Sequence, residues 1–219
     1  MKISICIPCM NRTHDLRITM PTLIAAAEAS PPVEIAVLDY NSQDDLEEYI
    51  KEITWEGIAY TKYTGNSYFH MGHARNMAML AGSGEYLIML STDIMMSQHY
   101  IIHLRKELGK GLWTHHSDTY VGVVCVPRQE FIDAGGYDER FEFYGKEDKD
   151  FLARLKRRGK PHTQIPDRLS LIYTPWSEKL LNYRGNPSRK KVSRLSMAIY
   201  TENCEREVLV ANEGKRWGV

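Results

Sequence analysis

The first half of the chain alternates short apolar runs with longer segments that mix polar and apolar residues. The apolar runs predict four strands, at residues 3–8, 33–40, 58–64 and 85–93. A segment with helix-starting polar residues or helical spacing follows each strand, at residues 11–30, 41–53, 72–84 and 97–111. This alternation is typical of parallel βαβ units, in which helices cover both faces of the sheet.

Polar residues, prolines and glycines mark the ends of these helices. Thr13 and Asp15 are candidate N-caps of the first helix, and Pro21 inside it predicts a kink or a late start. Gly82 or Gly84 is expected to end the third helix.

The second half of the chain is less regular. Residues 120–131 predict a strand that leads into a short helix, and residues 147–159 predict a helix. The stretch 167–174 is typical of a last strand. Residues 184–194 are basic and rich in turn formers, which fits a flexible acceptor-side loop, a partner-binding arm or a plain surface tail. No repeat or linker divides the chain, so we expect a single domain.

Composition and charge exclude several classes of protein. Lysine and arginine number 28, as do aspartate and glutamate, and this balance argues against a broad electrostatic grip on nucleic acid. No apolar run reaches the roughly 18 residues that a membrane-spanning helix needs. The N-terminal residues resemble a strand rather than a signal peptide, so a cytoplasmic location is the default expectation.

Cys6 and Cys9 match the C-x-x-C pattern of thiol redox motifs. In those motifs the first cysteine lies at a helix N-terminus, where its thiolate is stabilised. Cys6 lies inside an apolar run instead, so we expect it to be a buried strand residue. Neither a disulfide framework nor a zinc site is expected from the four cysteines of this chain.

Polar residues of chemical interest follow three of the predicted strands: Asn11 and Arg12 the first, Asp39 the second and Asp93 the fourth. Ligands of parallel α/β sheets bind outside the carboxyl ends of the strands. A carboxylate such as Asp93 at the mouth of a buried strand needs water, a cationic partner or a metal ion, unless it caps the next helix. Arg75, at the start of a helix, has a charged fork suited to phosphate.

Residues 144–151 place three carboxylates and two lysines in eight positions. Acids in the first turn of a helix are favourable by roughly 0.3–1 kcal/mol each, which accounts for Asp150. This helix-dipole effect does not account for the glycines and aromatic residues of the preceding segment, 135–145, which would form a surface for a ring-shaped ligand. A carboxylate beside such a surface can accept a proton from a hydroxyl nucleophile.

Four motifs together resemble family 2 glycosyltransferases of the GT-A fold: "ISICIPCMNR", "VEIAVLDYNSQDD", "HARNMAMLAGSGEYLIMLSTD" and "GGYDERFEFYGKEDKDFLARLKRRG". The last motif is also similar to the C-terminal segment of β-1,4-galactosyltransferases and of bacterial chondroitin polymerases. The resemblance covers roughly residues 2–160. It implies a Rossmann-like α/β domain with a mixed, mainly parallel sheet flanked by helices. A nucleotide-binding half would span 1–95, an acceptor and catalytic half 96–180, and a C-terminal extension 181–219.

The resemblance also implies roles for matching positions. Asp93, in the place of the family's DxD motif, would bind a divalent cation, Mn²⁺ or Mg²⁺, that bridges the diphosphate. Asp148 would be the general base, with Glu147 as its catalytic neighbour and Tyr144 and Gly145 binding the acceptor. The nucleotide would be bound by Pro8, Asn11, Arg12, Asp39, Asn41, Arg75 and Thr92.

Two positions depart from the family pattern. Ser91 replaces the first acid of the DxD motif, and the stretch after the last predicted strand has no histidine to serve as a metal ligand. His162 precedes that strand, and the pair His115–His116 is a poorer substitute. The metal would then be held mainly by Asp93, the diphosphate and water.

The leading hypothesis is an inverting glycosyltransferase that moves a sugar from a nucleotide-diphosphate donor, a UDP-sugar, to an acceptor hydroxyl, saccharide or other. One alternative is a nucleotide-sugar-binding module that has lost catalysis. Another is a nucleotidyltransferase, although residues 9–15 lack the glycine-rich phosphate loop of that class. A third takes the basic segment 184–194 as a nucleic-acid contact, with modified DNA as the acceptor.

Overall fold

A seven-stranded mixed sheet forms the centre of the protein, in the order β3-β2-β1-β4-β7-β6-β8. The computed structural model describes residues 1–110, 113–115, 122–165 and 169–219. Four parallel strands make up one side of the sheet and confirm the four predicted ones: β1 (Ile3–Cys9), β2 (Val33–Tyr40), β3 (Ile58–Tyr63) and β4 (Tyr86–Met89). β4 ends at Met89, so the predicted strand at 85–93 is too long.

The other side of the sheet contains short strands, and most of them were not predicted. β7 (Val124–Pro127) pairs antiparallel with β4, and β6 (Trp113–His115) pairs antiparallel with β7. β8 (His162–Gln164) is parallel to β6. Most of the strand pairings are parallel, which confirms the mixed, mainly parallel sheet.

A separate two-stranded ribbon lies beyond β4. It pairs β5 (Ile94–Met96) antiparallel with β9 (Leu169–Leu171). The prediction of a strand at 167–174 is therefore confirmed only for three residues, while residues 166–168 lie outside the described part of the chain. The Ile172 amide donates to the Asp93 carbonyl at 2.8 Å, so the ribbon continues alongside the segment that follows β4.

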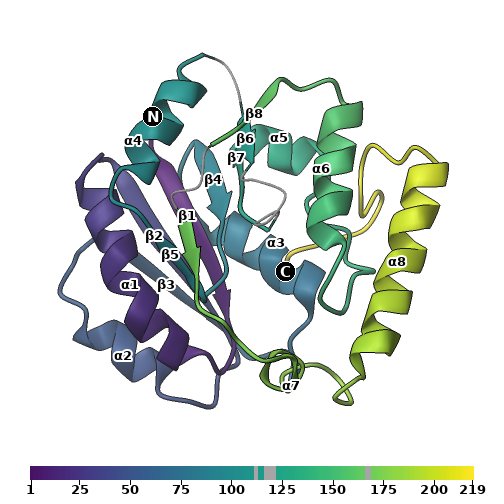
Figure 1. Cartoon of the computed structure of the whole chain (residues 1–219), viewed down its shortest axis with the longest axis horizontal. Helices are drawn as coiled ribbons and strands as arrows, with labels where there is room; N and C mark the ends of the chain where they lie inside the picture. The colour runs from purple at the N-terminus through teal and green to yellow at the C-terminus, as the bar shows by residue number, and fades with distance from the viewer. Residues whose placement is uncertain (111–112, 116–121, 166–168) are drawn as a thin grey trace.

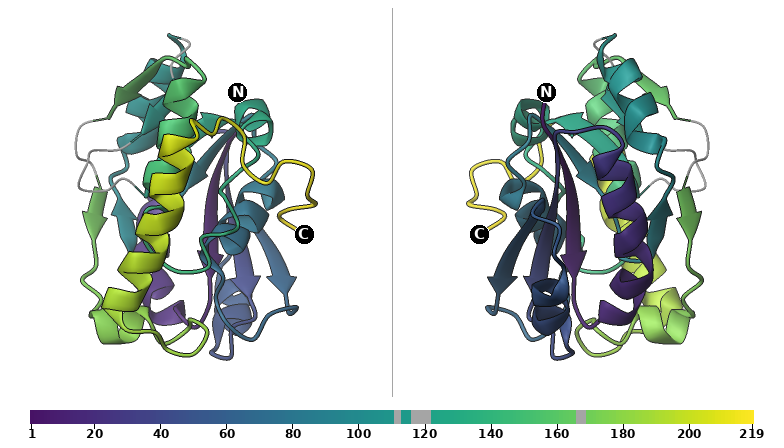
Figure 2. Two further views of the ribbon diagram at one scale, coloured as in Figure 1. Left: turned by 90° about the vertical axis from the view of Figure 1, so that its right-hand side faces the viewer. Right: turned by 90° about the vertical axis from the view of Figure 1, so that its left-hand side faces the viewer.

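Helices cover both faces of the sheet, as Figures 1 and 2 show. Ile3, Ile5 and Ile7 of β1 face one set of helices, because alternate residues of a strand point to opposite faces. That set is α1 (Thr13–Glu28), α2 (Leu46–Glu52) and α4 (Tyr100–Leu108). Cys6 faces the other set, α3 (Met71–Ala81), α5 (Arg128–Asp133) and α6 (Glu147–Arg157). Burial raises the pKa of the Cys6 and Cys9 thiols well above the ordinary value, which fits buried strand residues.

The start of α1 differs from the prediction. The helix begins at Thr13 rather than late, and neither Thr13 nor Asp15 caps it, since Arg12 holds the N-cap position without a side-chain bond. The Asp44 carboxylate, from the loop after β2, accepts from the Thr13 amide at 2.9 Å instead. A cap supplied from another loop leaves no local sequence signal. The prediction for α3 is confirmed, because Gly82 is its C-cap.

The C-terminal region is more ordered than its sequence indicated. Basic residues 189–194 belong to α8 (Arg189–Glu205), a helix of 17 residues whose N-cap is Ser188, so the interpretation of 184–194 as a loop or tail is wrong for this part. α8 packs beside α6 (Figure 1). The last residues return to α3, where the Val219 carbonyl lies 3.0 Å from Nε2 of His73. No described helix is long and apolar enough to span a membrane.

Candidate active site

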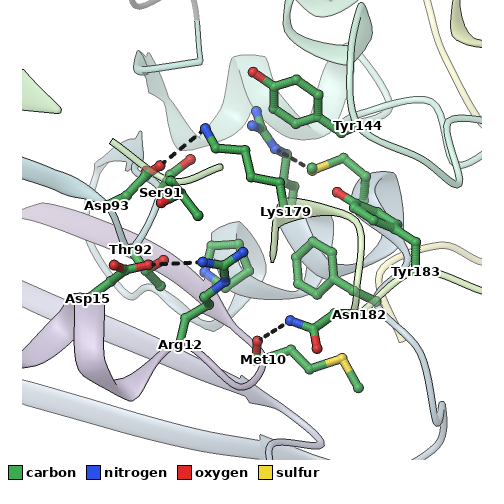
Figure 3. A pocket seen from close by; sticks show the side chains of 15 residues that line it. Met10, Arg12, Asp15, Ser91, Thr92, Asp93, Tyr144, Lys179, Asn182 and Tyr183 are labelled. Carbon is green, nitrogen blue, oxygen red and sulfur yellow. Dashed lines mark hydrogen bonds and ion pairs between the residues drawn. The ribbon is translucent and has the colours of Figure 1, made fainter. Parts of the chain in front are cut away.

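Two cavities with a common wall lie beyond the carboxyl ends of β1 and β4. The first is lined by side chains from β1, the starts of α1 and α3, the segment after β4 and the short helix α7 (Trp176–Lys179). Figure 3 shows these side chains. The second is bordered by the start of α6 and the loop before it. Five residues line both cavities: Arg75, Ser91, Asp93, Tyr144 and Lys179.

The predicted metal-binding and catalytic acids are brought together. Asp93 and Asp148 both border the second cavity, although they come from opposite halves of the chain. Glu147, Tyr144 and Gly145 line it as well. The segment after β4 and the start of α6 therefore form one composite site.

The residues predicted to bind the nucleotide divide into two groups. Four of them line the first cavity: Pro8, Arg12, Arg75 and Thr92. Asn11 lines a neighbouring cavity instead, next to Asn182. Asp39 and Asn41 line neither of the first two cavities, and the side-chain amide of Asn41 donates to the Asn66 carbonyl at 2.7 Å.

Asp39 lies next to the first cavity and is held by the fold. It pairs with Cys9 across the β1–β2 ladder, one residue beyond Pro8 of the cavity wall. Its Oδ1 accepts from the Ser42 amide and its Oδ2 from the Tyr60 hydroxyl, both at 2.7 Å. Each carboxylate oxygen can accept a further hydrogen bond, so this geometry orients the carboxylate without saturating it.

Asp93 has a lysine where the sequence predicted a metal ion. Nζ of Lys179 lies 3.6 Å from Oδ2 of Asp93, and Figure 3 shows this ion pair. Burial raises the pKa of the Asp93 carboxyl, and the nearby Asp15 acts in the same direction, while Lys179 opposes the shift. Asp15 itself pairs with Nη1 of Arg12 at 3.5 Å.

Among the described residues, the side chains around Asp93 do not by themselves form a metal site. Within the described residues, no three acidic, histidine or cysteine side chains could jointly hold a metal. His162 begins β8 and borders neither cavity, whereas the side chain of His115 and all of His116 lie outside the described residues. Asp93 is the only carboxylate of the predicted motif, so a hard divalent cation there would need most of its roughly six oxygen ligands from the diphosphate and from water.

Arg75 connects the two acids at the start of α6. It is 3% exposed; its Nη1 donates to Oδ1 of Asp148, and its Nη2 lies 3.3 Å from Oε1 of Glu147. Glu147 is 1% exposed and its Oε2 accepts from the Gly145 amide at 2.7 Å. Asp148 is the more accessible of the two, and its Oδ2 would lie 3.3 Å from a side-chain carbon at Gly122. The structure therefore gives Glu147 a fixed position and leaves one oxygen of Asp148 beside the cavity.

The rest of α6 fixes where Asp148 lies. Arg154 is fully buried, pairs with Asp150 at 2.9 Å, and donates to the carbonyls of Ala134 and Gly136 at 2.6 and 2.7 Å. Gly136 has φ of +64°, a conformation that glycine adopts most readily. Nδ2 of Asn203, from α8, donates to Asp150 at 2.8 Å. The buried half of α6 is thus tied to a turn and to the C-terminal helix.

Sequence reasoning did not predict several residues of the first cavity, among them three polar ones. Lys179 and Asn182 belong to no recognised motif, and Asp15 was considered only as a helix cap. Asn182 links the segment after α7 to the loop after β1. Its side-chain amide donates to the Met10 carbonyl at 2.7 Å, and its Oδ1 accepts from Asn11 at 2.9 Å. These contacts join segments far apart in sequence, so no local pattern could have indicated them.

Comparisons with known proteins agree with this architecture. A model of glycosyl transferase family 2 matches residues 4–169. No curated protein sequence matches with significance.

Several solved structures are similar to this chain despite low identity. The mannosyltransferase PcManGT from Pyrobaculum calidifontis, in complex with GDP-Man and Mn²⁺, has a TM-score of 0.71 at 14% identity, with 93% of this chain and 64% of that one covered. S. aureus TarS in complex with UDP has a TM-score of 0.60 at 13% identity, with coverage of 94% and 72%.

A third similar structure is a mutant of Drosophila β-1,4-galactosyltransferase 7 with manganese, UDP-Gal and xylobiose. It has a TM-score of 0.59 at 18% identity, with 88% of this chain and 79% of that one covered. At identities of 13–18%, these similarities show that the chain shares the fold of these proteins and nothing further. Since the family model matches more than half of the residues, this chain belongs to glycosyl transferase family 2 and has the GT-A fold.

Proposed function

We propose that this chain is an inverting glycosyltransferase, which transfers a sugar from a UDP-sugar to an acceptor hydroxyl. The observation that carries the proposal is the cavity shared by Asp93 and Asp148. The cationic side chains around Asp93 suit a diphosphate, and the accessible carboxylate of Asp148 in the same cavity suits a base. Residues 1–95 would bind the nucleotide, residues 96–180 the acceptor, and the extension 181–219 would support α6.

The donor would occupy the first cavity. Arg12, Arg75 and Lys179 line it and provide cationic groups for the phosphates. Pro8 and Thr92 would contact the nucleoside and phosphates from the ends of β1 and β4. Asp39, with Asn11 and Asn41 in the adjoining loops, would bind the base or ribose through the acceptor capacity that its two protein hydrogen bonds leave.

The acceptor would occupy the second cavity, between Tyr144, Gly145 and Asp148. Its hydroxyl oxygen would attack the anomeric carbon from the face opposite the diphosphate, and Asp148 would take the hydroxyl proton. The bond between the anomeric carbon and the phosphate oxygen would break, and its electron pair would go to the diphosphate. General-base assistance of this kind contributes about 10²–10⁴-fold to a rate. Glu147 would act by holding Arg75 and the Gly145 loop in place.

A divalent cation does not fit this scheme as a protein-held group. The similar mannosyltransferase and galactosyltransferase structures contain manganese. In this chain the expected ligand Asp93 is paired with Lys179, and no set of three ligands exists among the described residues. No step of the mechanism above therefore passes through a metal.

A nucleotide-sugar panel tests the proposal. The chain is mixed with UDP-sugars, GDP-sugars and a pool of saccharide acceptors, and both thermal shift and release of free nucleotide are measured. We expect UDP and at least one UDP-sugar to raise the melting temperature, and nucleotide release to require an acceptor. A thermal shift without any release would identify a binding module instead, and the absence of any shift or release would refute the proposal.

A further inference from the structure

Lys179 is one of two cationic side chains, with Arg75, that border both cavities of the composite site. It lines both cavities, is 23% exposed, and lies 3.6 Å from the Asp93 carboxylate and 5.8 Å from the Tyr144 ring centroid. Its position is fixed locally, since its backbone amide donates to the Pro175 carbonyl at 3.0 Å. The ammonium group thus stands between the segment after β4 and the aromatic side chain in front of α6.

The other two cations of the first cavity are also paired with acids. Arg12 pairs with Asp15, and buried Arg75 pairs with Glu147 and Asp148. Lys179 is paired with Asp93 at 3.6 Å, and within the described part of the chain no second acid forms an ion pair with it. Because an ammonium group carries three donors, at least two remain for a ligand in the cavity.

The position of the Lys179 ammonium disfavours a divalent ion at Asp93. An ion bound to Asp93 would lie within a few ångströms of the Lys179 ammonium and would be repelled by it. Ser91, in place of the first acid of the expected motif, offers a hydroxyl and no charge to offset that repulsion. A negatively charged phosphate experiences the opposite effect, because Lys179 attracts it and Asp93 limits the local positive charge.

We propose that the Lys179 ammonium takes the place of the divalent cation, so that this chain binds nucleotide diphosphates and transfers sugar without a metal. The inference rests on the proposed function. When the bond between the anomeric carbon and the phosphate oxygen breaks, the electron pair passes to that oxygen, and N–H groups of Lys179 donate to the diphosphate that leaves. The proton of the acceptor hydroxyl goes to Asp148, so Lys179 keeps all its protons throughout.

Calorimetric titration with UDP tests this inference without relying on turnover. The full chain is titrated with UDP twice, once in EDTA and once in Mn²⁺. In the second titration the Mn²⁺ is in large excess over UDP. We expect dissociation constants that agree within about twofold. A Lys179→Met variant should bind UDP at least about tenfold more weakly in EDTA, the loss typical of a charged hydrogen bond. The matched control is Lys106→Met, an exposed lysine of α4, which should bind as the wild type does.

Two further variants distinguish a direct role from damage to the fold. Lys179→Arg keeps the charge and should retain most of the affinity that Lys179→Met loses. Asp93→Asn removes a negative charge from beside the phosphates and frees Lys179, so UDP should bind more tightly in EDTA than it does to the wild type. If Asp93 held a metal instead, the same variant would weaken binding in Mn²⁺.

The outcomes separate the inference from the proposed function. Affinity for UDP that rises tenfold or more with Mn²⁺ would overturn the role of Lys179 and leave the glycosyltransferase intact. Wild-type affinity in Lys179→Met would overturn it too. Failure to bind any nucleotide in either condition would overturn the proposed function, and the inference with it.

Discussion

Acidic side chains lie at both ends of the parallel strands, the amino edge and the carboxyl edge of the sheet, but only the carboxyl edge has them beside the cavities of the site. At the amino edge, Oε1 of Glu34 accepts from the Ser4 hydroxyl and Oε2 from the Ser83 hydroxyl, both at 2.6 Å. Glu34 borders neither cavity of the active site. At the carboxyl edge, Asp93 and Asp148 are each paired with cations and border a shared cavity. An acid paired within the fold indicates function when its surroundings leave it room to meet a ligand.

The largest effect should come from Asp148→Asn, which keeps the shape of the side chain and removes the base. Turnover is expected to fall by about 10²–10⁴-fold, the usual contribution of general-base catalysis. The dissociation constant of UDP should change by less than about twofold. Initial rates of nucleotide release and a UDP titration measure both.

The matched control for that variant is Asp133→Asn, an exposed acid on α5 whose partner is Gln129. It should have the wild-type rate. Near-wild-type turnover in Asp148→Asn would remove Asp148 from the mechanism, and the comparison between the two edges would lose its functional meaning.

The next effect concerns a buried acid on the same helix as Asp148. Arg154→Met leaves Asp150 as a buried charge with Asn203 as its remaining side-chain partner. We expect the free energy of unfolding to fall by about 3–5 kcal/mol, as when one partner of a buried ion pair is removed. Urea denaturation measures it, with Lys156→Met, exposed on α6, as the control. A loss below about 1 kcal/mol would mean that this pair does not hold α6 in place.

A smaller effect on UDP binding is expected at Asp39. This residue lies at the carboxyl edge, but its carboxylate accepts hydrogen bonds from Ser42 and Tyr60 of the protein itself. Asp39→Asn should weaken UDP binding by about tenfold or more, because a hydrogen bond to a charged group contributes roughly 1.5–3 kcal/mol. Isothermal titration of UDP measures the change, and thermal melting reports the cost to the fold. If melting drops while UDP affinity is unchanged, Asp39 belongs with Glu34 as a structural acid.

The smallest effect is the pH dependence contributed by Glu34. Burial raises the pKa of this carboxyl, but hydrogen bonds from Lys2, Ser4 and Ser83 outweigh burial and lower the pKa from 4.5 to about 2. As the pH falls, the unfolded chain therefore takes up this proton at a higher pH than the folded chain does. The stabilisation is complete above pH 4.5 and is lost as the pH falls towards 2. Its size is on the order of 1–2 kcal/mol after allowance for solvent screening. Unfolding curves between pH 2 and 6 should show this slope in the wild type, and a Glu34→Gln variant that kept the full slope would contradict the assignment.

The sequence predicted the parallel strands well because their buried residues form unbroken apolar runs. It also placed Asp93 and Asp148 in one site, through motifs rather than through geometry. β6 and β8 were not predicted, since strands of three residues are too short to show a period. α8 was missed for a different reason: its buried residues are Val192, Ser196 and Asn203, so no apolar stripe marks the face that packs.

The pairing of Lys179 with Asp93 was beyond sequence reasoning as well. One residue follows the last strand and the other follows β4, and nothing in either segment specifies the contact. Only the folded chain brings them together, through the ribbon of β5 and β9 that runs between the two segments.

The most direct test of the site is a crystal structure of the chain with bound UDP. We predict the diphosphate in the first cavity within hydrogen-bond distance of Lys179, the uracil near Asp39, and the Asp148 carboxylate facing the phosphates from the second cavity. UDP bound away from these cavities would contradict the account. So would a diphosphate that does not contact Lys179 and that the Asp148 carboxylate does not face.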